Sequence, residues 1–318
     1  RVVAEKLSSM VGAEPRSIFV SNGATEAIQA VVQNFSSHIH INVPTFSPYY
    51  EFAGSEHRVT RFQLDPTENF VVDPQRYVDS VLKSGADTAV LISPNNPDGY
   101  LIPDSELNWI LSKLSDLSTV IVDESFIHFA SRDTVDSSHE GADGALPTLV
   151  GITEQFENVT VIKSMSKDFG IAGIRAGYAI MNPSRVDRLL DHGYLWNISG
   201  IAEYFFSLFN RSIFLYEYRD ILNTYLKYIE RFTSMTSRIN FLQAYPTDAN
   251  FQLIQMPSGV SSDLFTSLML IRHGIYVRSC GDKIGLDGEF LRVAIRTEPE
   301  NVEITDALSD VLGSIGHI

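Results

Sequence analysis

The chain reads Val161-Ile-Lys-Ser-Met-Ser-Lys-Asp-Phe-Gly-Ile-Ala-Gly-Ile-Arg-Ala-Gly-Tyr178 near its centre, and this is its most informative segment. Ser164 and Ser166 precede Lys167, and glycines and Arg175 follow it. A lysine that attacks an aldehyde needs a nearby cation to lower its pKa and small neighbours that allow close approach. Hydroxyl groups and an arginine beside it can hold a phosphate. A single lysine is usually a solvated surface charge, so the whole pattern, rather than Lys167 alone, predicts a lysine that forms a Schiff base.

The composition indicates a folded, acidic protein. Of its 318 residues 44% are hydrophobic and 20% are charged, which is enough apolar material for a sizeable core. Its 24 basic and 39 acidic residues give a formal charge of −15, which argues against a nucleic-acid or membrane-surface partner. No apolar run approaches the roughly 20 residues that span a bilayer. Cys280 is the only cysteine, which excludes an intrachain disulfide and fits a reducing, cytoplasmic location.

The order of predicted elements indicates an α/β fold. Residues 15–180 alternate short β-branched runs with longer helical patterns, which is typical of βαβ units around a parallel sheet. The predicted strands are Ser17–Val20, His38–Val43, Arg58–Phe62, Thr88–Ile92, Thr119–Val122, Val159–Ile162 and Gly177–Met181. The predicted helices between them are Ala24–Phe35, Ser47–Gly54, Pro74–Ser84, Ser105–Leu117 and Pro183–His192. Residues 131–147 are rich in Ser, Asp and Gly and predict a solvated loop.

A second, smaller α+β unit is predicted after Trp196. The pattern there is helical to about Ile239. The later elements are predicted as strands at Ala249–Gln255, Ile275–Val277 and Phe290–Ile295 and helices at Asp263–Arg272 and Asn301–Ile315. We therefore divide the chain into a large cofactor-binding domain, residues 1–195, and linker helices with a small C-terminal domain, residues 196–318.

Two motifs in the first half predict a seat for a phosphate and an aromatic ring. Val20-Ser-Asn-Gly-Ala-Thr-Glu26 links a strand to a helix, and Gly23, Ala24 and Thr25 expose backbone amides at the helix N-terminus, which favours a dianion. Phe46, in Val43-Pro-Thr-Phe-Ser-Pro-Tyr-Tyr50, is placed to stack on a planar ring. Alone, each would be an ordinary turn or a core aromatic residue.

Two further motifs place polar side chains at turns. Ser93-Pro-Asn-Asn-Pro-Asp-Gly99 forms a turn that can direct the side-chain amide of Asn96 as a hydrogen-bond donor. Ile121-Val-Asp-Glu-Ser-Phe126 ends a buried strand with the carboxylate of Asp123, which can pair with a cationic group. As isolated motifs, the first would be only a turn and the second a carboxylate that caps a loop.

Near the C-terminus, arginines lie among apolar residues. Tyr276-Val-Arg-Ser-Cys-Gly281 contains Arg278, and Phe290-Leu-Arg-Val-Ala-Ile-Arg296 contains Arg292. Strand alternation places Arg292 on the face opposite Leu291 and Val293. A guanidinium matches a carboxylate or a phosphate with two parallel hydrogen bonds, so both arginines are candidate ligands of the substrate's anionic groups.

The order of these motifs resembles fold-type-I pyridoxal-phosphate (PLP) enzymes of the class I/II aminotransferase family. The resemblance is greatest to the branch that contains histidinol-phosphate aminotransferases and threonine-phosphate decarboxylases, and it extends from Gly12 to the closing helix. It implies a mainly parallel central sheet flanked by helices, a smaller α+β domain, pyridoxal 5′-phosphate as cofactor and a homodimer.

The resemblance also implies a role for each residue. Lys167 would form the Schiff base and move the proton at the substrate α-carbon. Asp123 would hold the pyridine nitrogen. The phenolate oxygen would be bound by Asn96 and the ring covered by Phe46. The other implied ligands are Gly23, Ala24, Thr25, Ser164, Ser166 and Arg175 for the phosphate, and Arg278 and Arg292 for the substrate.

Several features depart from the family pattern. Phe126 stands where many relatives carry a tyrosine that also bonds the phenolate oxygen, and Asp98 replaces a common threonine. The chain starts inside an amphipathic helical pattern without an initiator methionine. We therefore expect further residues upstream, where relatives carry an arm that lines the substrate pocket and gives a tyrosine to the neighbouring subunit's cofactor phosphate.

The sequence leaves three functions open. We expect a transaminase that moves an amino group between an amino acid, or a phosphorylated amine, and an α-keto acid. A threonine-phosphate decarboxylase-like enzyme is the alternative, because residues 285–296 resemble that branch and fold does not imply function. A non-catalytic protein of the same fold is the third, and the presence of Lys167, Asp123, Asn96 and Arg175 together argues against it.

Overall fold

The computed structural model describes residues 2–54, 57–130, 146–195, 198–209 and 211–315. Its strands are β1 (Ile18–Ser21), β2 (His38–Val43), β3 (Arg58–Gln63), β4 (Thr88–Ile92), β5 (Thr119–Asp123), β6 (Val159–Ser164), β7 (Gly177–Ile180), β8 (Gln243–Ala244), β9 (Phe251–Gln255), β10 (Arg278–Ser279) and β11 (Phe290–Ala294). Its helices are α1 (Val2–Val11), α2 (Ala24–Phe35), α3 (Pro48–Glu51), α4 (Pro74–Ser84), α5 (Asp104–Lys113), α6 (Ile152–Gln155), α7 (Met165–Asp168), α8 (Pro183–Asp191), α9 (Gly200–Leu208), α10 (Ser212–Thr236), α11 (Ser262–His273) and α12 (Glu298–Ser314).

A seven-stranded sheet with the order β1-β7-β6-β5-β4-β2-β3 forms the centre of the larger part. The five strands from β6 to β3 run parallel, while β7 is antiparallel to both β6 and β1. Every residue of β4 and β5 is buried, as expected for central parallel strands that have helices on both faces. The carboxyl ends of β5 and β6 therefore meet at one edge, and they lead directly into Asp123 and Lys167.

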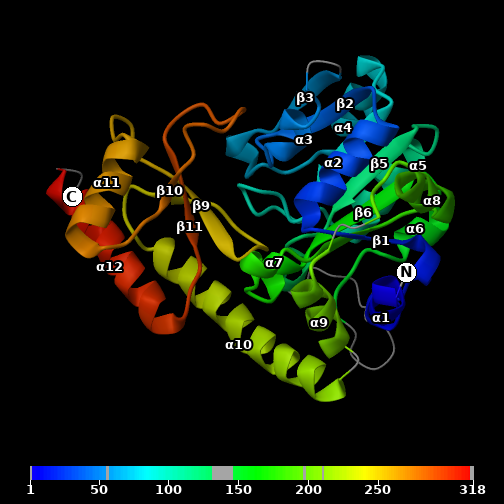
Figure 1. The fold of residues 1–318 in the computed structure, drawn as a ribbon. Helices are drawn as coiled ribbons and strands as arrows, with labels where there is room; N and C mark the ends of the chain where they lie inside the picture. The colour runs from blue at the N-terminus through cyan, green and yellow to red at the C-terminus, as the bar shows by residue number, and fades with distance from the viewer. Residues whose placement is uncertain (1, 55–56, 131–145, 196–197, 210, 316–318) are drawn as a thin grey trace.

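A four-stranded antiparallel sheet with the order β10-β11-β9-β8 forms the smaller part, packed against α11 and α12. Figure 1 shows the long helix α10 running from the neighbourhood of α9, beneath the large sheet, to the smaller sheet. The short helix α7, which carries Lys167, lies between the two sheets in the same view. The edge of the large sheet that carries the chemical motifs thus faces the second sheet.

The predicted fold class is confirmed, because the central sheet is mixed, mainly parallel and flanked by helices. The prediction of a strand at Ile275–Val277 is wrong: the strand of that region is β10, two residues long, and its partner β11 fixes its position. β8 was not predicted, and the helix predicted over Ser47–Gly54 is only α3. Most of the loop predicted at 131–147 lies outside the described residues. The division at residue 195 stays a prediction.

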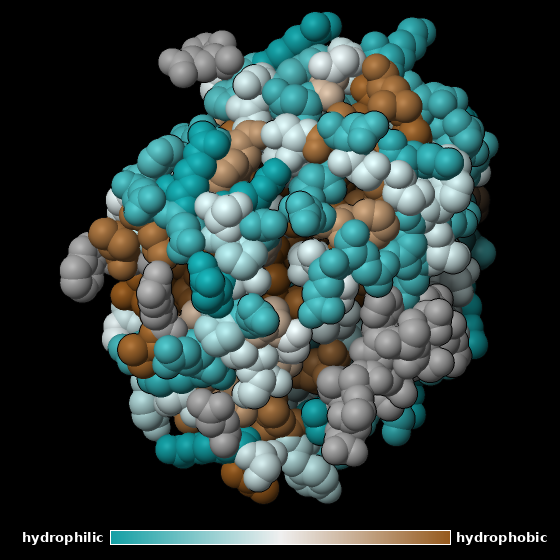
Figure 2. Space-filling model, turned by 90° about the vertical axis from the view of Figure 1, so that its right-hand side faces the viewer, coloured by the Kyte–Doolittle hydropathy of each residue, from teal (hydrophilic) through white to brown (hydrophobic). Residues whose placement is uncertain are grey.

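One face of the molecule is largely polar. On the face that Figure 2 shows, hydrophilic residues dominate and hydrophobic residues occur in separate small areas. Within the described residues, no helix is both long and apolar enough to cross a membrane. Among the described residues, exposed large hydrophobic side chains such as those of Tyr216 and Ile271 also occur, which is normal for a protein of this size.

Candidate active site

A cavity of about 480 Å³ opens where the two sheets face each other. This volume is within the range of small-molecule sites, about 300–1,000 Å³. Every residue that the sequence singled out lines it, except Gly23. The predicted residues in its wall are Ala24, Thr25, Phe46, Asn96, Asp123, Ser164, Ser166, Lys167, Arg175, Arg278 and Arg292.

One end of the cavity has the features of a phosphate site. Helix α2 begins there, and its N-cap residue Gly23 has φ +79° and no side chain to satisfy the first amides of the helix. A Cβ atom at Gly177 would lie 2.6 Å from the backbone nitrogen of Ala24, so the glycine keeps the approach to that amide open. A Cβ atom at Gly23 would lie 2.6 Å from Arg175 Nη2. The absence of both side chains lets the helix N-terminus and a guanidinium converge on one space.

Two further groups point to an anion at this end. Ser166 Oγ is buried without a hydrogen-bond partner among the described residues, and an unpaired buried hydroxyl is costly unless a ligand satisfies it. Arg175 is anchored by two carbonyl acceptors, Ala172 O at 3.3 Å from Nη1 and Asn22 O at 3.4 Å from Nη2. The residues present therefore fit a phosphate dianion, such as that of pyridoxal 5′-phosphate.

Lys167 lies on α7, immediately after the carboxyl end of β6, and its side chain reaches the cavity. Burial lowers the pKa of its amine, and the charges of Arg292 and Arg175 lower it further. A lower pKa increases the fraction of neutral amine, which is the form that attacks an aldehyde. Position and electrostatics both suit the predicted Schiff-base lysine.

Asp123 ends β5, lines the cavity and is 3% exposed. Its Oδ1 accepts a hydrogen bond from the Ser125 amide at 2.9 Å, and its Oδ2 accepts one from the Tyr49 hydroxyl at 2.8 Å. Burial raises the pKa of this carboxyl, whereas the bonds from Ser125 and Tyr49 and the charge of Lys163 lower it. The carboxylate is thus held rigidly where a ring nitrogen is expected.

Asn96 and Arg292 come from different sheets and meet in the cavity. Arg292 Nη1 donates to Asn96 Oδ1 at 2.6 Å, and its guanidinium carbon lies 5.0 Å from the centre of the Phe251 ring. Such a distance is suitable for a cation–π contact. Phe251 in turn packs edge-to-face on Phe126, the residue that replaces a family tyrosine. Phe126 therefore lacks the hydroxyl of the family tyrosine, and its ring instead packs on Phe251, the ring that contacts the Arg292 guanidinium.

Arg278 lies beside Arg292. The two residues are directly opposite each other in the pairing of β10 with β11, and both line the cavity. Arg278 Nη2 donates to Asp282 Oδ2 at 2.6 Å, in an ion pair that is largely open to solvent. Exposed pairs of this kind contribute little, so a substrate anion can compete for Arg278.

A buried ionic cluster behind Lys167 was not predicted. Lys163 Nζ lies 2.8 Å from Asp168 Oδ2 and donates to the Glu124 carbonyl at 3.1 Å. His128 Nδ1 lies 3.3 Å from Asp168 Oδ2 and 2.9 Å from the hydroxyl of Tyr218 on α10. Burial lowers the pKa of His128 and raises that of Asp168 to about 6. In the sequence, the only sign of this cluster is that Lys163 and Asp168 lie close to Lys167 in the quoted segment. Charged residues are normally exposed, so the sequence gives no reason to expect that these two are buried as a pair.

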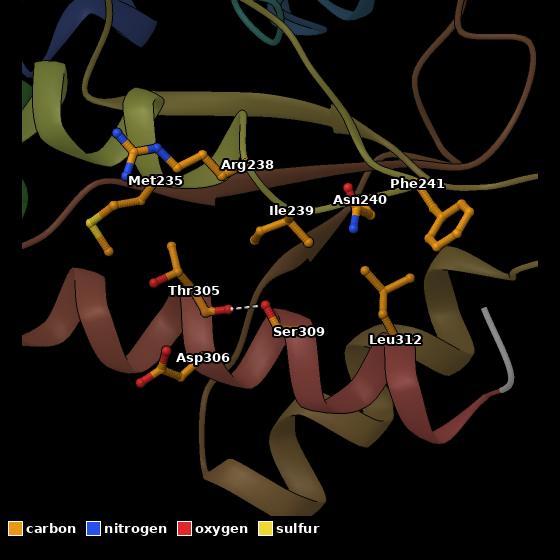
Figure 3. Close-up of a pocket in the computed structure, with 9 residues that line it drawn as sticks. All are labelled: Met235, Arg238, Ile239, Asn240, Phe241, Thr305, Asp306, Ser309 and Leu312. Atoms are coloured by element: carbon orange, nitrogen blue, oxygen red, sulfur yellow. Dashed lines mark hydrogen bonds between the residues drawn. The ribbon is translucent and has the colours of Figure 1, made fainter. Parts of the chain in front are cut away.

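A second hollow, of about 440 Å³, lies in the smaller part between the end of α10 and α12 (Figure 3). Arg238 and Asp306 lie on its two sides, and Met235, Ile239 and Leu312 supply apolar surface. None of the predicted site residues lines it. Among the described residues, no group of His, Cys, Asp and Glu could hold a metal ion. The cavity around Lys167 is therefore the candidate active site.

Comparisons with known proteins agree with this geometry. The sequence profile of the family "Aminotransferase class I and II" matches residues 3–308. The chain is 43% identical, over 98% of its length and 78% of the relative, to the L-serine phosphate decarboxylase Cj1436c of Campylobacter jejuni. Among solved structures, a decarboxylase from Sulfurospirillum multivorans has a TM-score of 0.91 and 38% identity, covering 98% of this chain and 86% of that chain.

The predicted branch is confirmed as well. The histidinol-phosphate aminotransferase of Clostridium acetobutylicum has a TM-score of 0.84 and 26% identity, covering 98% of this chain and 88% of that chain. However, the two relatives named as decarboxylases have higher sequence identity to this chain, 43% and 38%, than this aminotransferase. The comparisons therefore favour the alternative function, a decarboxylase, over the transaminase. The chain belongs to the class I and II aminotransferase family of fold-type-I enzymes, and its cofactor is pyridoxal 5′-phosphate.

Proposed function

We propose that the protein is a decarboxylase that uses pyridoxal 5′-phosphate and acts on O-phospho-L-serine. The observation that carries this proposal is the 43% identity, over 98% of the chain, to an L-serine phosphate decarboxylase. Transamination remains the second candidate, because the histidinol-phosphate aminotransferase of similar fold is 26% identical and a Schiff-base lysine serves both reactions.

The charges around Lys167 support a substrate with two anionic groups. O-phospho-L-serine carries a carboxylate and a phosphate, and each needs a cation in a partly buried site. Arg278 and Arg292 supply two guanidinium groups on adjacent strands, facing each other across the sheet pairing. We assign Arg292 to the carboxylate, because its partner Asn96 lies beside the expected ring, and Arg278 to the substrate phosphate, because it lies nearer to solvent.

The proposed reaction converts O-phospho-L-serine and one proton into O-phosphoethanolamine and carbon dioxide. The cofactor, when bound, supplies a ring that accepts the electron pair of the bond to the carboxyl carbon. Asp123 would keep the proton on the pyridine nitrogen, and Asn96 would donate its amide to the phenolate oxygen. Lys167 would deliver the proton to the α-carbon after the carboxyl carbon has left. In a transaminase the same lysine would instead remove the α-proton and deliver it to the cofactor.

The test is an analysis of products. The purified protein, supplied with pyridoxal 5′-phosphate, is incubated separately with O-phospho-L-serine, O-phospho-L-threonine and L-serine, and phosphorus and proton NMR follow the mixtures. We expect O-phosphoethanolamine from the first substrate and much slower turnover of L-serine, which cannot satisfy Arg278. Formation of a keto acid that depends on added 2-oxoglutarate would favour the transaminase.

We also propose that the protein acts as a homodimer in the cytoplasm. The family resemblance supports the dimer, and a single buried cysteine supports a reducing compartment. Light scattering on the protein as it elutes from a size-exclusion column measures its molecular mass and so distinguishes a dimer from a monomer. A monomer that is fully active would contradict the dimer.

A further inference from the structure

Tyr49 lies behind the cavity wall, close to the groups that hold the cofactor. It belongs to α3, three residues after Phe46 in the segment that follows β2. Phe46 lines the cavity, whereas Tyr49 is completely buried and belongs to the apolar cluster that also contains Ala27, Ile28 and Ile41. The segment from Phe46 to Tyr49 therefore supplies one side chain that lines the cavity and one that lies buried behind the cavity wall.

The hydroxyl of Tyr49 makes one specific contact. It lies 2.8 Å from Asp123 Oδ2, the carboxylate placed to face the pyridine nitrogen. Burial, with the nearby Asp123 charge, raises the pKa of Tyr49 well above its usual value, so the hydroxyl stays protonated and acts as the donor. An ionised carboxylate only accepts hydrogen bonds, which fixes the direction of this one.

Counting acceptor sites shows what this bond leaves available. An ionised carboxylate has about four lone-pair positions. In Asp123 one is used by the Ser125 amide on Oδ1 and one by Tyr49 on Oδ2, and the Ser125 hydroxyl is a third donor to this carboxylate. The Ser125 hydroxyl oxygen itself accepts a hydrogen bond from the Ser164 amide at 3.1 Å, so Ser125 ties Asp123 to the end of the neighbouring strand β6. An acceptor position remains for a ring nitrogen, because Asp123 also lines the cavity.

The bond matters because Asp123 is deeply buried. Burial raises the pKa of its carboxyl, and a neutral carboxylic acid could not keep a proton on the pyridine nitrogen. A buried charge-assisted hydrogen bond opposes that effect and cannot be replaced by water in an apolar surrounding. Phenylalanine at position 49 would keep the packing and remove only the donor.

We propose that Tyr49 is a positioning residue that keeps Asp123 ionised and aimed at the pyridine nitrogen of the cofactor. This inference rests on the assigned role of Asp123 and is independent of the substrate. Tyr77 provides a matched control: it is also completely buried, does not line the cavity, and donates its hydroxyl to a backbone acceptor, the Val90 carbonyl, at 2.9 Å.

The experiment compares Tyr49→Phe with Tyr77→Phe by ¹⁵N NMR of protein reconstituted with cofactor labelled at its pyridine nitrogen. We expect the wild type and Tyr77→Phe to show the protonated nitrogen and Tyr49→Phe to shift toward the unprotonated position. The cofactor dissociation constant, measured by equilibrium dialysis, should rise at least about tenfold in Tyr49→Phe and stay within about twofold in Tyr77→Phe.

A double-variant comparison separates this role from simple packing. In the Asp123→Asn background, Tyr49→Phe should change the cofactor dissociation constant by less than about twofold, because Tyr49 acts through Asp123. Two results would overturn the proposal. One is an unchanged ¹⁵N signal in Tyr49→Phe; the other is a tenfold weaker cofactor binding caused by Tyr49→Phe both with and without the Asp123 carboxylate. If Tyr49→Phe does not fold, 3-fluorotyrosine at position 49 keeps the shape and strengthens the donor. Its cofactor dissociation constant should then be equal to or lower than that of the wild type, and a rise of about tenfold would equally overturn the proposal.

Discussion

Arg292 donates a hydrogen bond from Nη1 to Asn96 Oδ1 at 2.6 Å, across 196 positions of sequence. This contact fixes the orientation of the Asn96 amide. Since its oxygen faces Arg292, its NH₂ group faces elsewhere and remains available to donate to the phenolate oxygen of the cofactor. The remaining N–H groups of Arg292 are available for a carboxylate. One contact thus links the site assigned to the ring with the site assigned to the substrate.

Replacing Arg292 by lysine should weaken substrate binding. Lysine keeps the charge but cannot bond Asn96 and a carboxylate in the same plane. We expect KM for the substrate to rise about tenfold or more, and the cofactor dissociation constant to rise by a smaller factor, because Asn96 loses the partner that orients its amide. Arg296→Lys is the control, because Arg296 pairs with Glu300 on the surface and should leave KM unchanged. Equal KM values in the two variants would show that Arg292 does not bind the substrate.

Gly23→Ala should weaken cofactor binding. The new Cβ would lie 2.6 Å from Arg175 Nη2, so the guanidinium must move away from the phosphate end of the cavity. Gly85→Ala is the matched control, because Gly85 also has a positive φ, +69°, but nothing within 4 Å of the new atom. Both variants carry backbone strain, about 1–2 kcal/mol in the left-handed region of Gly85 and more at Gly23, whose ψ of 164° belongs to a region that is almost exclusive to glycine. The comparison is therefore made on cofactor binding and not on stability. Equilibrium dialysis should show a weaker cofactor complex, by about tenfold, for Gly23→Ala alone.

Asp168→Asn should destabilise the fold around Lys167. The change removes one charge of a completely buried pair and leaves Lys163 without its carboxylate partner. Breaking such a pair costs about 3–5 kcal/mol. Urea titration measures the decrease in the free energy of unfolding. The double variant Lys163→Met/Asp168→Leu should recover much of it, since no uncompensated charge remains. A single variant as stable as the wild type would show that Lys163 finds another partner, of which Glu124 is the nearest candidate.

His40 should make stability depend on pH. Burial, with the nearby His38, lowers the pKa of His40 to about 4, whereas in the unfolded chain it is about 6.5. Between these values the unfolded state binds a proton that the folded state does not, so the free energy of unfolding should fall as the pH decreases from about 6.5 to about 4. The shift corresponds to at most about 3 kcal/mol. His40→Gln should remove this part of the pH dependence in denaturant titrations at several pH values.

Local sequence patterns predicted much of the large sheet. β2, β4, α2 and α4 have the predicted bounds, because each is a continuous apolar or amphipathic run that ends at a turn or capping residue. β10 was misplaced because its position is set by pairing with β11. Ile275–Val277 satisfies local β propensity, but the partners of Leu291 and Arg292 are Ser279 and Arg278.

The residues that the sequence singled out, except Gly23, line one cavity, their assigned roles stay predictions, and their mutual contacts were not predicted. Each motif was visible because it combines a turn with a reactive or charged side chain, and the cavity brings them together. The bond from Arg292 to Asn96, the Tyr49 hydroxyl on Asp123 and the Lys163–Asp168 pair join residues through packing that no local pattern encodes. Tyr49 in particular is indistinguishable in sequence from its half-exposed neighbour Tyr50.

The most direct measurement uses O-phospho-L-serine labelled with ¹³C at its carboxyl carbon, incubated in heavy water with the protein and pyridoxal 5′-phosphate. The account predicts stoichiometric labelled carbon dioxide and O-phosphoethanolamine with one deuterium on the former α-carbon, because Lys167 delivers a solvent-derived proton there. Lys167→Ala should form neither product. Retention of the label, with transfer of the amino group to 2-oxoglutarate, would contradict the account and restore the transaminase.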